Sequence, residues 1–301
     1  MKVVFAISLV PSELSDDWNL TQVNLRRTIG SIRGSTTKDY HIVVAAHDRP
    51  DLGETDCGDV TVLMAPCPIE RDLMRRGVDK LNKRRLIGSW LRDRLDDEGA
   101  YVMFLDADDL VHRDLAGYVL RDGNRRSYLV EKGYIFDAST GMLSRKKVRF
   151  FGTCGSCFIC WFSRDELPLS WDDGHCLYSH FDLHREFGEV AAKCGKTADA
   201  LPFHAVVYFT NHGESLRRKQ FNEFREVEFS GLVLPREARR ILRADFSVPD
   251  LAEAISGIWG VVHGISVSCV RRTHHLVLRH ILRGRRGNGR ENAAEAIRDM
   301  R

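Results

Sequence analysis

Uninterrupted apolar runs recur through the first hundred residues of the chain. They lie at 3–10, 40–46, 60–65 and 101–105, and turn or polar residues bound each of them. Continuous runs of this length, in place of strict alternation, are typical of strands that are buried on both faces. The pattern therefore predicts a parallel sheet, and 205–210 has the pattern of one more strand.

Helical periodicity separates the first of these runs. In 18–34 and 78–95 apolar residues recur every three or four positions, so each segment has one apolar face. Strand and helix alternating in this order predict a doubly wound α/β unit. Further along, we expect a hairpin with its turn at 139–141 and a helix over 178–195 that Gly195 ends.

Polar residues follow three of the predicted strands. They form the clusters Ser8–Ser12, His47–Arg49 and Asp106–Asp109. In open α/β sheets ligands bind just outside the carboxyl ends of the strands. We therefore expect the three clusters to converge at one edge of the sheet.

The third cluster places several carboxylates at the end of an apolar strand. Asp106 and Asp108 are two residues apart where the chain leaves the strand, so both can turn toward one point. Converging carboxylates repel unless a cation lies between them, and hard oxygen ligands suit Mg²⁺ or Mn²⁺. The alternative is a solvated acidic turn in which Asp108 or Asp109 caps the next helix.

Composition narrows the classes of protein. The 301 residues are 43% hydrophobic and 29% charged, as in an ordinary globular protein, and the net charge of +3 does not indicate a nucleic-acid partner. The start of the chain is typical of a first strand rather than a signal peptide, and no apolar stretch reaches the roughly 18 residues of a membrane span. We expect a cytoplasmic protein.

Three of the eight cysteines, Cys154, Cys157 and Cys160, have a spacing that suggests an iron–sulfur or zinc site. The alternation of the surrounding residues instead favours small free thiols in the core.

The character of the chain changes near Pro235. The segments that follow have a helical pattern, and 271–290 contains seven arginines and three histidines without a carboxylate. This pattern predicts a helical C-terminal extension with a basic end. Because apolar residues interleave with the charge, an anionic lipid surface is a candidate partner.

The stretch YVMFLDADD resembles the D-x-D signature of GT-A glycosyltransferases, of the family 2-like nucleotide-diphospho-sugar transferases. Short stretches carry the resemblance, in order, over about residues 1–215. It implies a Rossmann-like, mostly parallel sheet flanked by helices. It also implies a nucleotide-sugar-binding half at 1–110, a donor-sugar and acceptor half at 111–230, and a basic helical extension at 231–301.

The resemblance also implies roles for residues in the first half. Asp106 and Asp108 are implied to coordinate the metal that bridges the diphosphate, with Asp109 as a helper. Asp48 is implied to lie near the nucleotide base or ribose. Pro11 and Ser12 are implied to lie beside Asp48 and to bind the nucleotide sugar with it. Lys83 and Arg84 are implied to offer positive charge to the diphosphate or to hold the acidic motif in place. The alternative for Lys83 and Arg84 is a solvated helix face.

Three later positions match the same pattern. Gly155 and Ser156 resemble the loop that lets backbone approach the donor sugar and acceptor. Asp182 matches the acidic catalytic base of inverting members, although His180 and Phe181 precede it in place of the commoner Glu-Asp pair. His212 matches a metal-ligating histidine after a late strand, with His204 as the second choice.

The implied activity is transfer of a sugar from a nucleoside diphosphate donor, a UDP-sugar being favoured, to a hydroxyl. The resemblance implies Mn²⁺ or Mg²⁺ as the cofactor and a glycan or lipid-linked glycan as the acceptor. Inverting chemistry through Asp182 is expected, and contact with the inner face of the membrane is expected through the C-terminal arginines.

Two alternatives belong to other classes. FLDADDLV also resembles the first motif of haloacid-dehalogenase-like phosphatases, with Asp106 as nucleophile and Asp108 as general acid around Mg²⁺. That motif normally lies on the first strand of its fold, whereas about a hundred residues of α/β pattern precede it here. The second alternative is a non-enzymatic binding protein that acts through its basic C-terminal helices.

Overall fold

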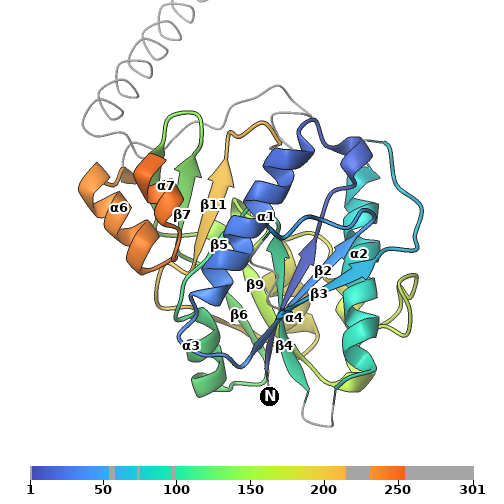
Figure 1. Ribbon diagram of the computed structural model, residues 1–301. Helices are drawn as coiled ribbons and strands as arrows, with labels where there is room; N and C mark the ends of the chain where they lie inside the picture. Colours follow the sequence, from blue (N-terminus) through green and yellow to red (C-terminus); the bar gives the residue numbers. More distant parts are fainter. Residues whose placement is uncertain (1, 54–57, 73–74, 96–98, 215–230, 255–301) are drawn as a thin grey trace, which may run out of the picture. The chain divides into compact units, whose positions relative to one another are not determined.

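The structure is a computed structural model that describes residues 2–53, 58–72, 75–95, 99–214 and 231–254 (Figure 1). The chain divides into two units, Met1–Ile255 and Ser256–Arg301, and the described residues belong to the first. The arginine-rich segment 271–290 lies outside them. In the described part of the chain, no helix combines the length and apolar character needed to cross a membrane.

The larger sheet has seven strands in the order β10-β6-β9-β4-β1-β2-β3. Strands β1 to β4 run parallel, as the apolar runs predict, while β9 is antiparallel to both β4 and β6. The sheet is therefore mixed, and the α/β class is confirmed. The strand bounds are β1 Val3–Ser8, β2 Tyr40–Ala46, β3 Val60–Met64, β4 Ala100–Asp106, β6 Ser127–Leu129, β9 Phe158–Phe162 and β10 Ala198–Ala200.

A second sheet of four strands has the order β5-β11-β7-β8. Its strands are β5 Leu110–Val111, β7 Gly133–Asp137, β8 Met142–Lys146 and β11 Val206–Thr210. The antiparallel pair β7 and β8 confirms the predicted hairpin. Asp137 Oδ1 accepts hydrogen bonds from the Ser139 amide and hydroxyl, and Gly141 has a φ of 68°, so the turn has the residues it requires.

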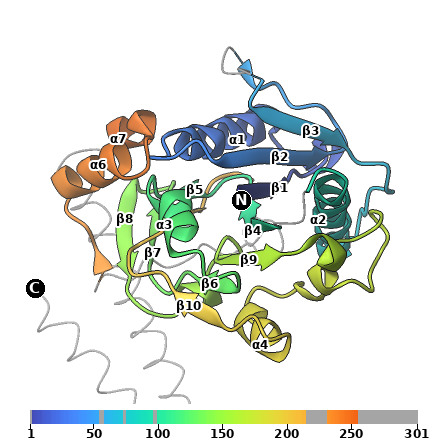
Figure 2. The ribbon, with the colours of Figure 1, turned by 90° about the horizontal axis from the view of Figure 1, so that it is seen from below.

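Helices cover both faces of the larger sheet. Figure 2 shows α2 on one side of the strands and α3 with the second sheet on the other. α1 begins after Asp17, whose carboxylate accepts from the Leu20 amide, and packs beside β5. The helix bounds are α1 Trp18–Arg33, α2 Arg76–Arg92, α3 Leu115–Asp122, α4 Phe187–Lys193, α6 Pro235–Ala244 and α7 Pro249–Ala254.

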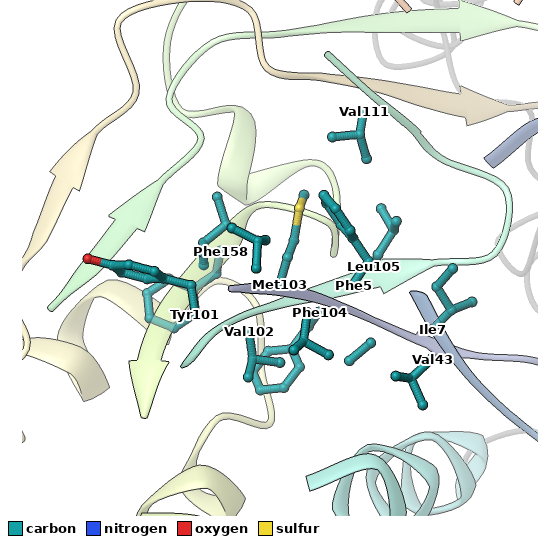
Figure 3. Close-up of a cluster of buried hydrophobic side chains, with 14 of the residues drawn as sticks. Phe5, Ile7, Val43, Tyr101, Val102, Met103, Phe104, Leu105, Val111 and Phe158 are labelled. Atoms are coloured by element: carbon teal, nitrogen blue, oxygen red, sulfur yellow. The ribbon is translucent and has the colours of Figure 1, made fainter. Parts of the chain in front are cut away.

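The core lies on both sides of β4. Val102 and Phe104 point to one side of this strand and Met103 and Leu105 to the other, and none of the four is more than 1% exposed (Figure 3). Because both faces of the sheet are buried at β4, the strand has apolar residues at successive positions and no alternation with polar ones. The burial stops at Asp106, which is the last residue of β4.

Two predicted helical features differ from the structure. The helix expected over 178–195 is a 3₁₀ turn at Leu177–His180, an irregular stretch, and then α4, with Gly195 at a φ of 73° beyond its end. The alternative in which Asp108 or Asp109 caps the next helix is also wrong, because β5 follows this turn and α3 begins only at Leu115.

The helices α6 and α7 belong to the first unit. Ala238, Ile241 and Leu242 of α6 are buried together with Val233 and Phe246 in a cluster that includes residues of the second sheet. The structure thus divides after Ile255, whereas the sequence prediction places an extension at 231–301.

Candidate active site

The carboxyl ends of three neighbouring strands meet at one edge of the larger sheet. Ser8 of β1 lies opposite Ala45 of β2 and opposite Asp106 of β4. The residues that follow each strand are the three polar clusters named from the sequence. Their predicted convergence is confirmed, and parallel pairing is its cause.

Asp106 is held from two sides. Its Oδ1 accepts from the ammonium of Lys80, near the start of α2, and its backbone amide donates to Ser156 Oγ at 2.9 Å. A Cβ at Gly155 would lie 2.8 Å from Asp106 Oδ2, so this position admits only glycine without a shift of the carboxylate. Burial alone would raise the pKa of Asp106, but Lys80 lowers it below its ordinary value.

Asp108 pairs with His212, which follows β11. His212 Nε2 lies 2.8 Å from Asp108 Oδ2, and the ring stacks on Phe209 with centroids 5.1 Å apart. The Glu214 amide donates a hydrogen bond to His212 Nδ1 at 3.2 Å. The proton of the neutral ring therefore lies on Nε2, which donates a hydrogen bond to Asp108. The structure thus brings together Asp108 and His212, two of the three residues that the resemblance implies as metal ligands. His204, the second choice, lies before β11 at the other end of that strand.

Asp109 is a fully buried carboxyl that ties the second sheet to the acidic turn. It accepts from the Ser156 hydroxyl at 2.6 Å, from Cys154 Sγ at 3.0 Å and from the Phe209 amide at 3.1 Å. Burial, followed by the charges of Asp108 and Asp106, raises the pKa of Asp109 well above its ordinary value. Its surroundings make it a structural group rather than a ligand open to solvent.

The cysteine cluster has a packing role in this structure. Cys154, Cys157 and Cys160 are free and buried, as the alternation of their neighbours predicts. Burial raises the pKa of each thiol, which keeps the sulfur protonated at neutral pH.

Asp48 and Ser12 form the second polar contact of the edge. The Ser12 amide donates to Asp48 Oδ2 at 2.8 Å and lowers the pKa of this carboxyl. Pro11 precedes the 3₁₀ turn Ser12–Leu14 that presents the amide. The predicted neighbourhood of Pro11, Ser12 and Asp48 is therefore present.

Lys83 lies deeper and has a different partner from the one expected. Its side chain is fully buried, and its ammonium donates to Asp79 Oδ2 at 2.6 Å and to the Leu9 carbonyl at 2.7 Å. His47 Nε2 lies 2.8 Å from the other oxygen of Asp79. The ammonium that reaches the acidic motif is that of Lys80, which the sequence analysis did not single out.

His47, Cys67 and Asp79 also meet the distance requirement for a metal site, because their ligand atoms lie within 4.8 Å of one another. Both oxygens of Asp79 are nevertheless engaged, one by His47 and one by Lys83. Since Lys83 already supplies the buried positive charge, this group is better described as an ion network than as a metal centre.

Arg84 lies under the edge, where its guanidinium is 4.6 Å from the centroid of Phe104. Burial lowers the pKa of Arg84, while the charges of Asp106 and, more weakly, Asp182 oppose this effect. Arg84 is only 4% exposed, so the expectation of a solvated helix face does not hold for it. Asp182 itself is exposed, in the stretch between the 3₁₀ turn and α4.

His184 is a second residue that the sequence analysis did not single out. Its Nδ1 lies 2.6 Å from the Phe151 carbonyl, so this nitrogen carries the proton and Nε2 keeps its lone pair. Burial lowers the pKa of His184, and the hydrogen bond and the charge of Asp106 oppose the decrease. A neutral imidazole within the field of Asp106 can accept a proton.

The donor set at the edge fits a hard divalent cation in its chemistry. Asp106 and Asp108 offer carboxylate oxygen, and His212 would offer Nε2 once its proton has moved to Nδ1, a combination that suits Mn²⁺ and, with fewer protein ligands, Mg²⁺. In the described part of the chain, however, the three do not approach one another as closely as His47, Cys67 and Asp79 do. Lys80 and His212 each satisfy one carboxylate in place of a shared ion.

A scan against protein-family models finds no match for this chain, and a search of curated proteins finds none either.

Proposed function

We propose that the protein is a metal-dependent glycosyltransferase of GT-A type that moves a sugar from a nucleoside diphosphate, with UDP favoured, to a hydroxyl. The observation that carries the proposal is the pairing of Asp108 with His212 beside the Asp106–Lys80 pair at the carboxyl edge of the sheet. At this edge the two carboxylates and the imidazole suit a divalent metal ion, and the ammonium suits the negative charge of a diphosphate bound to that ion.

Each residue has a place in the reaction. Asp106, Asp108 and His212 would hold the divalent ion, which would neutralise charge on the departing diphosphate. Asp48, with its low pKa and its hydrogen bond to Ser12, presents a charged acceptor to the base or ribose of the nucleotide. Gly155 keeps the wall beside Asp106 free of a side chain.

The acceptor hydroxyl has to lose its proton when it attacks the sugar. Asp182 is the base expected for inverting chemistry, and Nε2 of His184 is the second group in this region that can take the proton. Loss of turnover in Asp182→Asn but not in His184→Gln assigns the base to Asp182, and the reverse assigns it to His184. The acceptor we propose is a glycan or a lipid-linked glycan.

The phosphatase alternative fits the described contacts less well. It requires Asp108 to donate a proton as general acid, whereas Asp108 Oδ2 accepts a hydrogen bond from His212. The motif also follows three other strands of the sheet, on β4.

A thermal-shift panel of UDP, GDP, CDP and dTDP, each with and without Mn²⁺, tests the proposal. We expect UDP to stabilise the protein and Mn²⁺ to increase the shift, and Asp108→Asn to remove the Mn²⁺-dependent part. Asp165→Asn is the matched control, because the Asp165 side chain is 95% exposed. The proposal fails if no nucleotide stabilises the protein or if Asp108→Asn behaves like wild type. Mg²⁺-dependent hydrolysis of p-nitrophenyl phosphate would favour the phosphatase instead.

A further inference from the structure

Lys80 is a partly exposed residue of the candidate site. The ammonium contacts Asp106 Oδ1, and the backbone carbonyl of Lys80 accepts from Ser8 Oγ at 3.3 Å, which ties this turn of α2 to the end of β1. The side chain of Lys80 is 36% exposed and that of Asp106 is 27% exposed. The pair is therefore open to solvent on one side and to any ligand that enters from there.

Lys83, on the same helix, is a lysine whose ammonium is held in place by its partners. Lys83 is fully buried and has two partners, Asp79 and the Leu9 carbonyl. Lys80, one helical turn earlier, is half-buried, and among the described residues its ammonium contacts one carboxylate, that of Asp106. An ammonium on a flexible, partly solvated chain can change partners at low cost, whereas a buried one cannot.

The contact of Lys80 with Asp106 also occupies an oxygen that a metal ion needs. A divalent ion at this oxygen would lie next to the ammonium, and the repulsion of like charges at such a distance opposes joint occupation. A diphosphate removes the conflict because its oxygens offer the ammonium a stronger partner than one carboxylate.

We propose that Lys80 is an exchangeable cation of the site, which neutralises Asp106 when the nucleotide is absent and moves to a diphosphate oxygen when a metal-bound nucleoside diphosphate enters. The inference rests on the proposed function and adds the order of binding. Metal alone has to compete with Lys80 for Asp106. Metal and diphosphate together do not, so each strengthens the binding of the other.

Lys80→Met tests this inference because it keeps the length of the side chain and removes its charge. Titration calorimetry measures two affinities, that of Mn²⁺ for the nucleotide-free protein and that of UDP at saturating Mn²⁺. We expect the variant to bind Mn²⁺ alone about fivefold more tightly and UDP about fivefold more weakly, as for a partly exposed charge contact of about 1 kcal/mol. The affinity for uridine should change less, since uridine has no phosphate.

Two variants serve as controls. Lys80→Arg keeps the charge and should retain both wild-type affinities to within about twofold, the span of a substitution that preserves the ion pair. Lys193→Met, on the exposed side of α4, removes a lysine that lies outside the site and should change neither affinity. Thermal unfolding of all variants shows whether the fold is kept.

The opposite signs of the two effects make the inference falsifiable. If Lys80→Met leaves both affinities unchanged, or weakens both together, Lys80 does not exchange and the inference is overturned while the glycosyltransferase proposal stands. If the wild-type protein binds no nucleoside diphosphate, the proposed function fails and the inference fails with it.

Discussion

At the scale of single residues, space beside Asp106 decides whether the site can form. Gly155→Ala places a methyl group 2.8 Å from Asp106 Oδ2, and the short carboxylate, held by Lys80, has to rotate away. We expect a loss of about 1 kcal/mol in the free energy of unfolding and at least about tenfold weaker Mn²⁺-dependent UDP binding. Gly152→Ala is the control, because a Cβ there meets nothing within 4 Å. Equal binding by the two variants would contradict this account.

A second residue-scale prediction concerns acid stability. Burial, followed by the charges of Arg145 and Lys132, lowers the pKa of His204 to about 4, and its Nε2 has no hydrogen-bond partner in the described part of the chain. Between this value and the ordinary pKa near 6.5, the unfolded chain binds more protons than the folded one, so stability falls as pH falls.

His204→Phe removes this dependence, because Phe can keep the stacking of the ring on Tyr134, 4.8 Å away, and does not titrate. From pH 7 to pH 5 the wild type should lose about 1 kcal/mol more than the variant, with allowance for the partial exposure of His204. Urea unfolding at both pH values measures the difference. Parallel losses in the two proteins would show that His204 is protonated in the fold at little cost.

The sequence could predict which residues meet in the site only where those residues follow the carboxyl end of a strand. Asp48 with Ser12, and Asp108 with His212, follow strands whose carboxyl ends share an edge, so their meeting follows from topology. Lys80 could not be chosen in the same way, because residues 80, 83 and 84 lie on one side of α2. Their depth depends on how far along the helix each meets the sheet, and only packing determines that.

At the scale of elements, one ion network joins the ends of β1 and β2 to α2. Asp79 holds both His47 and Lys83, and Lys83 also reaches the Leu9 carbonyl. Asp79→Asn leaves a fully buried ammonium without its counter-charge, and we expect it to cost about 3–5 kcal/mol. Lys83→Met should cost less, since the variant keeps the contact of Asp79 with His47 and buries an apolar side chain.

Chemical denaturation of the two variants and of the double variant Asp79→Asn/Lys83→Met measures this order. The double variant should be more stable than Asp79→Asn alone, because it removes the unpaired charge. A Lys83→Met variant that is the least stable of the three would contradict the network described here.

Between residues 178 and 195 the helix that periodicity predicts is interrupted, and tertiary packing is the reason. Phe181 and Phe187 are both fully buried, and both rings pack against Phe104 and Phe158. Six residues apart on a continuous helix, they would point about 120° away from each other. The chain leaves the helix between them so that both reach one aromatic cluster, a tertiary requirement that periodicity alone does not reveal.

At the scale of the whole molecule, the second sheet and α6 set the end of the first unit. The apolar face of α6 closes a core with Leu110, Phe136 and Leu143, which come from three strands of that sheet. The sequence indicated a helix near this position. Because the arginines of this helix dominate its sequence, they suggested a basic extension, whereas its apolar residues pack into the core of the first unit. An extension that begins at 231 would remove these contacts, and one that begins after Ile255 would not.

Two truncations distinguish these boundaries. A chain that ends at residue 255 should unfold at a temperature close to that of the full chain, because it keeps the first unit whole. A chain that ends at residue 230 loses the buried side chains of Ile241, Leu242, Phe246 and Leu251, each worth about 1.5–3 kcal/mol. Since a domain is stable by only about 5–15 kcal/mol, we expect the shorter chain to lose its cooperative unfolding transition. Calorimetry of the three chains measures this. A cooperative transition at the wild-type temperature in the shorter chain would show that the second sheet does not depend on α6.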